Sequence, residues 1–247
     1  MHATALLGQT WKLSDVVEIV AETPRAKTIW FDIPDWPGHR AGQHVDVRLT
    51  AENGYQAERS YSIASAPNGT RIALTVARVE DGDVSPFLCD DLRPGDRIEL
   101  RGPLGGYFAW EPDQGGPLFL VADGSGVAPL MAMIRLRAAT QSETDACLLL
   151  SSRSWADIIY REELERLSGD GLTVVHTLTP SQPPGWTGYE RSVDAQMLAA
   201  VGPPPAARPR AYISGPTPFV ELVANALVEL GHSPDRIRTE HFGPTGG

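Results

Sequence analysis

Apolar and polar side chains alternate over short stretches in the first part of the chain, up to about residue 110, with Gly, Pro and Asn between the stretches. Between residues 44 and 50, Val45, Val47 and Leu49 would point one way and the polar side chains the other. Such alternation predicts β-strands with one buried face. The predicted strands span residues 15–22, 28–33, 44–50, 58–65, 71–79 and 96–101.

Long connections join these short strands, which favours an all-β Greek-key antiparallel barrel. One short helix is expected within it at residues 85–92, with Ser85 as the N-cap and Pro86 at the first helical position. The strand at 58–65, ERSYSIAS, carries an unusual number of polar side chains, which barrel packing alone does not require.

The pattern changes after residues 110–118, where continuous apolar runs begin to alternate with amphipathic segments. This order is typical of an α/β doubly wound domain with a parallel sheet covered by helices. We therefore predict two domains, 1–112 and 113–247, and interpret the Pro-rich residues 202–210 as a loop. The predicted strands are 118–122, 146–152, 172–178 and 211–214, and the predicted helices are 128–139, 156–167 and 217–230.

Composition and charge exclude several classes of partner. The net charge of −10 argues against a nucleic-acid-binding protein, which would need a basic face. The longest apolar runs have the length of strands and are too short to cross a membrane. The first twelve residues lack the basic and then apolar order of a signal peptide, so we expect a cytoplasmic protein.

Metal centres are not expected either. The two cysteines, Cys89 and Cys147, are too few for an iron–sulfur cluster with four thiolate ligands. The six histidines show no spacing typical of a metal site, and a structural zinc site would need more ligands of these types.

Two glycine-containing turns follow predicted strands of the second domain and open predicted helices. The first holds Gly124, Ser125 and Gly126, and the second holds Gly215 between Ser214 and Pro216. Each alone is as compatible with a tight turn as with a phosphate site. Because ligands of open α/β sheets bind at the carboxyl ends of strands, the two together favour a dinucleotide site.

Arg153 comes just after another predicted strand of this domain. In one interpretation it is a solvated loop residue, beside an i,i+4 pair between Asp157 and Arg161. In the other it binds a ribose 2′-phosphate, which favours NADP over NAD. No acidic residue ends the strand at 146–152, where an NAD site often holds the ribose hydroxyls.

The barrel contributes further candidate motifs: GDVS at residues 82–85, where a helix start suits a pyrophosphate, and GPLGGYF at 102–108. With RSYS at 59–62, GSGVAP at 124–129, SGPTPF at 214–219 and EHF at 240–242, their order and spacing resemble the ferredoxin–NADP reductase superfamily of flavoproteins. The resemblance spans most of the chain and implies FAD and a nicotinamide nucleotide as cofactors.

The resemblance also implies residue roles. Arg59 would bind the FAD pyrophosphate, Tyr61 would lie against the isoalloxazine and Ser62 would reach toward N5, while Phe242 would shield the flavin and Glu240 would lie near the active centre. The backbone of Gly82, Asp83, Val84 and Ser85 would help bind the pyrophosphate, and Gly124, Ser125, Gly126, Gly215 and Pro216 would contact the nicotinamide nucleotide.

Two departures from the family pattern bear on activity. Ser214 stands where many members have a cysteine, and Thr179-Pro180 stands where NADP-specific members often have Ser-Arg. The second departure leaves Arg153 as the candidate for the 2′-phosphate. NADPH is therefore the expected donor, with NADH still possible.

The resemblance implies an FAD-dependent NAD(P)H oxidoreductase, with hydride passing between nicotinamide and flavin N5 and single electrons passing to a separate acceptor. Because two cysteines do not suffice for a fused iron–sulfur domain, the expected partner is a separate ferredoxin, flavodoxin or oxygenase component. One alternative is a reductase of free flavin or another small molecule. Another is a flavin-binding redox sensor or regulatory subunit with little turnover, which Ser214 motivates.

Overall fold

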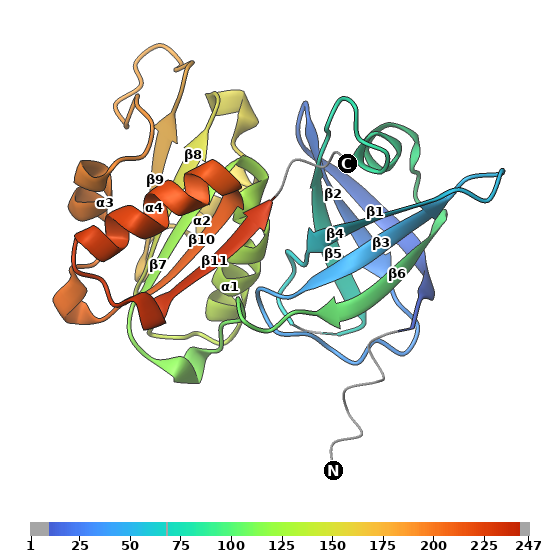
Figure 1. Ribbon diagram of the computed structural model, residues 1–247, viewed down its shortest axis with the longest axis horizontal. Helices are drawn as coiled ribbons and strands as arrows, with labels where there is room; N and C mark the ends of the chain where they lie inside the picture. Colours follow the sequence, from blue (N-terminus) through green and yellow to red (C-terminus); the bar gives the residue numbers. More distant parts are fainter. Residues whose placement is uncertain (1–9, 68, 243–247) are drawn as a thin grey trace.

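The computed structural model describes residues 10–67 and 69–242, which form two sheets that lie side by side (Figure 1). The first is a six-stranded sheet in the order β4-β3-β6-β1-β2-β5, and every pair of neighbouring strands is antiparallel. A bridge between Ile63 and Leu74 connects the two edge strands and closes the sheet. The predicted Greek-key antiparallel barrel is thus confirmed. The strands are β1 (Lys12–Thr23), β2 (Ala26–Asp32), β3 (His44–Thr50), β4 (Gln56–Ser62), β5 (Arg71–Ala77) and β6 (Arg97–Leu104).

Alternation in the sequence places the core of the barrel. On β3, Val45 and Val47 are fully buried, while Asp46 and Arg48 point to the outer face. Phe31 and Ile63 fill the same interior. Burying such side chains contributes about 1.5–3 kcal/mol each relative to leaving them exposed, which pins the register of each strand.

The short helical segment of the barrel differs from the prediction at its start. A π-helical turn spans Phe87–Asp91, and Ser85 makes no capping hydrogen bond to it. Instead, the Ser85 hydroxyl accepts a hydrogen bond of 3.0 Å from the backbone N–H of Val79. Ser85 therefore closes the loop that follows β5, and the prediction of Ser85 as an N-cap is wrong.

The second sheet is parallel and five-stranded, in the order β11-β10-β7-β8-β9. Helices α1 and α2 cover one face, and α3 and α4 cover the other, as the doubly wound prediction requires (Figure 1). The strands are β7 (Leu118–Asp123), β8 (Ala146–Ser152), β9 (Leu172–Leu178), β10 (Arg210–Pro216) and β11 (Ile237–Phe242). The helices are α1 (Val127–Ala139), α2 (Arg161–Leu167), α3 (Ala195–Val201) and α4 (Thr217–Glu229).

Two elements of this domain were not predicted, and one was predicted too long. Helix α3 begins where the Asp194 carboxylate accepts a hydrogen bond of 2.7 Å from the Met197 N–H. Strand β11 adds an edge next to β10, beyond the last predicted helix. The helix expected at 156–167 begins only at Arg161, because Tyr160 has a left-handed backbone with φ 60°.

The strand order creates a switch point at the centre of the sheet. Strands β7 and β10 are neighbours, and the chain winds outward from them in opposite directions, to β8 and β9 and to β11. The turns after β7 and β10 therefore lie together at the carboxyl edge, where open α/β sheets bind ligands. The predicted domain boundary near Asp113 falls in the 3-10 turn Pro112–Gln114, between β6 and β7. Within the described ranges, no helix has the length and apolar character needed to cross a membrane.

Candidate functional site

A cavity of about 710 Å³ lies between the two domains and is lined by both. The barrel contributes residues of β3, β4 and β5 and the loop after β5, and the second domain contributes the turn after β7 and the end of β11. All the residues predicted for the flavin site come together here, with Ser125 from the predicted nicotinamide nucleotide site. They are Arg59, Tyr61, Ser62, Gly82, Asp83, Val84, Ser85, Ser125, Glu240 and Phe242.

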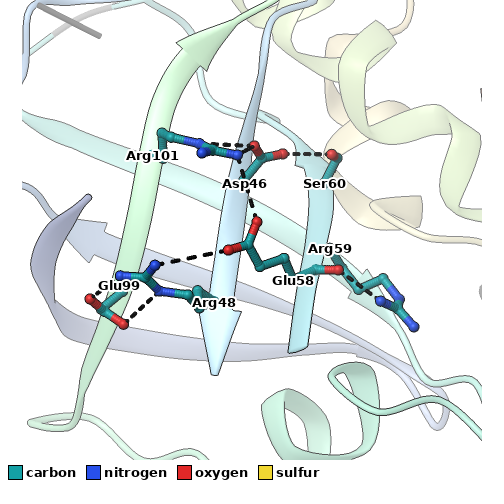
Figure 2. A network of polar contacts seen from close by, with 7 residues as sticks. All are labelled: Asp46, Arg48, Glu58, Arg59, Ser60, Glu99 and Arg101. Atoms are coloured by element: carbon teal, nitrogen blue, oxygen red, sulfur yellow. Dashed lines mark hydrogen bonds and ion pairs between the residues drawn. The ribbon is translucent and has the colours of Figure 1, made fainter. Parts of the chain in front are cut away.

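Strand β4 divides its polar side chains between two faces. Glu58 and Ser60 point to the outer face of the barrel (Figure 2). There Glu58 forms ion pairs with Arg48 of β3 and Arg101 of β6, and Ser60 forms a hydrogen bond. In this network Asp46 accepts hydrogen bonds from Ser60 and Arg101 at 2.6 and 2.7 Å. These contacts therefore stabilise the sheet surface. Ser60 also lines the cavity, together with the alternate residues of β4.

Arg59 and Tyr61 are those alternate residues. The Arg59 guanidinium is turned away from the outer network, with Nη2 3.2 Å from Asp83 Oδ2 and Nη1 2.8 Å from the Glu58 carbonyl oxygen (Figure 2). Tyr61 packs against the barrel core, and burial raises the pKa of its hydroxyl above the usual value. The cavity wall thus presents a cation and a neutral aromatic ring two residues apart on one strand, where side chains point to the same side.

Ser62 ends β4 and is buried, yet it lines the cavity. Its hydroxyl donates a hydrogen bond of 3.1 Å to Oε1 of Glu240, at the end of β11. Burial raises the pKa of Glu240 from 4.5 to about 7, and the bond from Ser62 opposes this only in part. The second carboxyl oxygen, Oε2, is buried without a hydrogen-bond partner among residues 10–67 and 69–242, so this wall of the cavity presents an unsatisfied acceptor.

The two glycine turns of the second domain abut. A Cβ atom on Gly126 would lie 2.2 Å from the carbonyl oxygen of Ser214, so the approach requires glycine. Ser214 is fully buried, and its hydroxyl has no partner in the described structure. Gly215 follows with φ 149° and packs against Asp123, whose pKa is raised by burial. Ser125 reaches the cavity itself; Gly124, Gly126, Ser214, Gly215 and Pro216 lie beside it.

Arg153 lies apart from the cavity, exposed at the carboxyl end of β8. Its carbonyl oxygen accepts a hydrogen bond of 3.1 Å from Ser181, which joins the loops after β8 and β9. The alternative i,i+4 pair is not formed. Asp157 accepts a hydrogen bond of 2.6 Å from Ser154, and the Arg161 guanidinium stacks over the Trp155 ring at 5.2 Å.

Sequence patterns missed several residues of the cavity wall. His44 begins β3, and burial lowers its pKa, while Thr75 is a buried hydroxyl inside the apolar strand β5. The polar Thr75 within RIALTVA was the available signal. Nothing in the sequence distinguished His44 from other strand-end residues.

The donor set fits a dinucleotide with an aromatic ring system. The volume is within the usual range of cofactor pockets, about 300–1,000 Å³. Arg59 suits an anion, and the rings of Tyr61 and Phe242 suit a flat partner. The same set does not suit a metal, since the described ranges contain no group of three His, Cys, Asp or Glu side chains placed to hold one.

Comparison with known families matches each domain separately. The oxidoreductase FAD-binding domain matches residues 16–109, and the oxidoreductase NAD-binding domain matches residues 120–225. The boundary between the two matches lies at the loop between β6 and β7.

Individual relatives cover most of the chain. Over 248 residues it is 32% identical to a glycine betaine monooxygenase reductase subunit of Pseudomonas aeruginosa, covering 96% of this chain and 67% of that one. It is 36% identical over 211 residues to a ferredoxin–NADP reductase B of Sorangium cellulosum, with 82% and 84% covered. A 3-ketosteroid-9-alpha-monooxygenase ferredoxin reductase component of Mycolicibacterium smegmatis is 32% identical, with 92% and 64% covered. The chain thus spans about two thirds of the length of these monooxygenase reductases.

Solved structures show the same fold. An Amycolatopsis cytochrome P450 reductase superimposes with a TM-score of 0.83 at 26% identity, covering 96% of this chain and 71% of that one. A ferredoxin NADP+ reductase of Neisseria gonorrhoeae, solved with FAD and NADP bound, gives 0.81 at 20% identity, with 94% and 98% covered.

Proposed function

Because the chain belongs to the ferredoxin–NADP reductase superfamily of flavoproteins, we propose that it takes hydride from a nicotinamide nucleotide and passes single electrons to a separate protein acceptor. The observation that carries this proposal is the cavity shared by the two domains, with Arg59 and Tyr61 on one side and Glu240 and Phe242 on the other domain. Bound FAD would supply the exchange between two-electron and one-electron transfer.

The residues of the barrel would hold the cofactor. Arg59 is half-buried and would exchange its ion pair with Asp83 for the pyrophosphate, a charge-assisted contact. The backbone N–H groups of residues 82–85 would complete that site, and Gly82 keeps the loop tight because a Cβ there would lie 3.0 Å from the Ser85 hydroxyl. Tyr61 and Phe242 would flank the ring system and exclude water.

Ser62 and Glu240 would work as a pair in the same cavity. Their hydrogen bond joins the end of β4 to the end of β11, so it fixes one domain against the other at the reacting centre. With a pKa of about 7, Glu240 can hold a proton near neutral pH and present it to a bound group through Oε2.

The nicotinamide nucleotide would bind along the carboxyl edge of the parallel sheet. The turns with Gly126 and Gly215 allow close approach of its phosphates, and Ser214 would lie beside the nicotinamide. We propose NADPH as the preferred donor, since Arg153 is exposed at the end of β8 and no described ion pair engages its side chain. NADH remains a second donor in this proposal.

Rapid mixing tests the hydride step. Purified protein loaded with FAD is mixed anaerobically with NADPH or NADH, and flavin absorbance is followed. Bleaching on the timescale of turnover supports the proposal. A flavin that stays oxidised with both donors contradicts it.

A group of arginines bears on the acceptor. The arginine surface consists of Arg208, Arg210, Arg236, Arg238 and Tyr107, at the amino ends of β10 and β11 and in the loop after β6. Among the residues that the structure describes, none of these arginines forms an ion pair with a carboxylate. Asp235 carries a negative charge close to Arg236, and its carboxylate accepts a hydrogen bond from the Ser233 hydroxyl.

Backbone contacts hold the arginine surface in place. Arg210 donates to the Gln114 carbonyl oxygen at 2.8 Å, and Arg236 donates to that of Pro209 at 3.2 Å. The Arg238 guanidinium lies 4.8 Å from the ring of Tyr107, which is 63% exposed. Burial and the charges of Arg210 and Arg208 lower the pKa of Arg236. The surface is therefore a concentration of unneutralised positive charge on an acidic protein.

This surface adjoins the cavity. Arg238 and Glu240 are two residues apart on β11 and point to the same side, so they are about 7 Å apart along the strand. Arginine and tyrosine are also among the residues enriched in binding hot spots. We propose that the acceptor is an acidic electron carrier, a ferredoxin, flavodoxin or oxygenase component, and that it docks on the arginine surface.

Charge reversal tests the docking. The rates of reduction of an acidic plant-type [2Fe–2S] ferredoxin and of a neutral quinone are measured. The proteins compared are wild type, the double variant Arg208→Glu/Arg238→Glu and a control variant, Arg166→Glu. Arg166 lies on α2, near the opposite edge of the sheet. We expect the double variant to lose about tenfold in kcat/KM with ferredoxin at low ionic strength, and the quinone rate to stay within about twofold. Equal ferredoxin rates in all three proteins would contradict the docking.

Reduction of free flavin or another small acceptor is the second candidate function, and a redox sensor with little turnover is the third. Ser214 favours the sensor, because its buried hydroxyl has no partner in the described part of the chain and stands where many members of the family have a cysteine. Quinone or flavin rates that no protein carrier improves would favour the small-molecule reductase. We further propose a cytoplasmic location, since Cys89 and Cys147 are both free and buried.

A further inference from the structure

Tyr160 has a backbone conformation that its side chain disfavours. It adopts φ 60° and ψ 25° between the 3-10 turn Trp155–Asp157 and α2, and its side chain is almost completely buried. A bulky residue in the left-handed region costs about 1–3 kcal/mol and persists only where surrounding contacts determine it. Two of the hydrogen bonds that hold Tyr160, to Thr75 and Glu22, come from the other domain.

A chain of hydroxyl groups joins Tyr160 to the barrel. Its hydroxyl is hydrogen-bonded to Thr75 Oγ1 on β5, and Thr75 Oγ1 is in turn 2.8 Å from Thr28 Oγ1 on β2. Thr28 and Thr75 are directly opposite each other in the β2–β5 register. Because Thr75 also lines the cavity, the Tyr160 hydroxyl touches the wall of the flavin site from the nucleotide-binding domain.

Two charged side chains reinforce the contact. Glu22 of β1 accepts a hydrogen bond of 3.3 Å from the Tyr160 N–H. Arg135 of α1 lies 4.8 Å from the Tyr160 ring, donates to the Ala64 carbonyl oxygen at 2.7 Å, and pairs with both carboxyl oxygens of Glu163 on α2. Through Arg135, helix α1, which follows the first glycine turn, is also bonded to the barrel next to Tyr160.

We propose that Tyr160 is a positioning residue: through Thr75, its hydroxyl fixes the loop after β8 and helix α1 against the flavin-binding wall, and so sets how the nicotinamide meets the flavin. The proposal rests on the proposed hydride transfer. The loop concerned runs from Arg153 to Tyr160, so one short segment carries the candidate 2′-phosphate contact at one end and the barrel contact at the other.

In the proposed reaction the flavin and the nicotinamide are held by different domains. Rings held by different domains stack correctly only if the domain interface is rigid, and a misplacement of 1 Å can cost about 100-fold in rate. Loss of the Tyr160 hydroxyl removes a buried hydrogen bond and leaves Thr75 with one partner fewer. The Tyr160 ring, its contact with Arg135 and the Glu22 contact do not need that hydroxyl.

Tyr160→Phe tests the positioning role, and Tyr212→Phe is its matched control. Tyr212 is equally buried, and its hydroxyl donates to the Ala109 carbonyl oxygen at 3.2 Å, away from the cavity wall. A Thr75→Val variant and the Tyr160→Phe/Thr75→Val double variant complete a cycle, because hydroxyls that act as one unit give non-additive effects.

Three properties of the FAD-loaded proteins are measured: the hydride-transfer rate from NADPH, the long-wavelength charge-transfer absorbance of the nicotinamide–flavin complex, and amide hydrogen exchange without NADPH. In Tyr160→Phe we expect an about tenfold slower hydride transfer, a weaker charge-transfer band and NADPH affinity within about threefold of wild type. Exchange should rise about tenfold in residues 71–77 and 161–167. Tyr212→Phe should match wild type in all three properties.

Two results would overturn the proposal: wild-type hydride transfer and charge-transfer absorbance in Tyr160→Phe, or equal losses in Tyr160→Phe and Tyr212→Phe. If neither nicotinamide nucleotide reduces the wild-type flavin, the proposed function fails, and the exchange experiment alone decides on the contact. Unchanged exchange in both segments of Tyr160→Phe would then reject it.

Discussion

The Ser62 hydroxyl donates a hydrogen bond of 3.1 Å to Oε1 of Glu240, which is 178 residues away in the sequence. The bond joins the barrel to the parallel sheet inside the shared cavity, where burial raises the pKa of Glu240 to about 7. A carboxyl group is therefore held in the wall of the shared cavity, and its protonation state changes near neutral pH.

Glu240→Gln should abolish a pH dependence of stability. Since the folded protein binds this proton more tightly than the unfolded chain, the stability from Glu240 is complete below pH 4.5 and is lost as the pH rises through 7. The shift corresponds to about 3 kcal/mol. In protein freed of FAD, the variant should have the higher Tm at pH 8 and a similar Tm at pH 4.5. The exposed Glu221→Gln is the control, and parallel Tm profiles for all three proteins would refute the assignment.

Arg59→Ala should weaken FAD binding. A charge-assisted hydrogen bond contributes about 1.5–3 kcal/mol, so we expect a loss of about 10- to 100-fold in affinity when the protein is titrated with FAD. Arg97→Ala removes a comparable arginine, paired with Asp15 at 2.9 Å far from the cavity, and should bind FAD like wild type. Equal FAD affinities of the two variants would rule out the pyrophosphate role.

Ser214→Ala should raise stability and slow the reaction. A buried hydroxyl without a partner costs about 1–3 kcal/mol, so its removal should raise the Tm of the protein freed of FAD. Ser152, at the end of β8, also has a buried hydroxyl without a partner among the described residues. Ser152→Ala should therefore also raise the Tm. Only Ser214→Ala should slow flavin reduction by NADPH. A reduction rate equal to that of Ser152→Ala would remove Ser214 from the active centre.

Arg153→Ala should discriminate between the two donors. Its exposed side chain would contact only the ribose 2′-phosphate, so we expect the KM for NADPH to rise about tenfold or more and the KM for NADH to change less than threefold. Arg166→Ala on α2 is the control for general charge. A similar rise of KM for both donors would contradict the 2′-phosphate contact.

Much of the fold was predictable because each domain has one dominant periodicity. Alternation located the barrel strands, and apolar runs located β7, β8, β9 and β10. Predictions from local sequence were wrong where a tertiary contact determines the conformation. Ser85 has the sequence context of an N-cap, but its hydroxyl bonds to Val79. Tyr160 interrupts a helical pattern because contacts from the barrel hold it in a left-handed conformation.

The parts of the candidate site that consist of short sequence motifs could be predicted. RSYS, GDVS and EHF named residues that now line one cavity. The hydrogen bond between Ser62 and Glu240 could not be predicted from the sequence, and neither could the contact of Thr75 with Tyr160. Each joins residues of different domains. The arginine surface forms only when the ends of β10 and β11 lie side by side.

Anaerobic rapid mixing of the FAD-loaded protein with NADPH and with NADH is the decisive test of hydride transfer from nicotinamide to flavin. We expect the flavin absorbance to bleach on the timescale of turnover, faster at low NADPH than at equally low NADH, and to recover when oxidised ferredoxin is added. A flavin that stays oxidised with both donors would contradict the account.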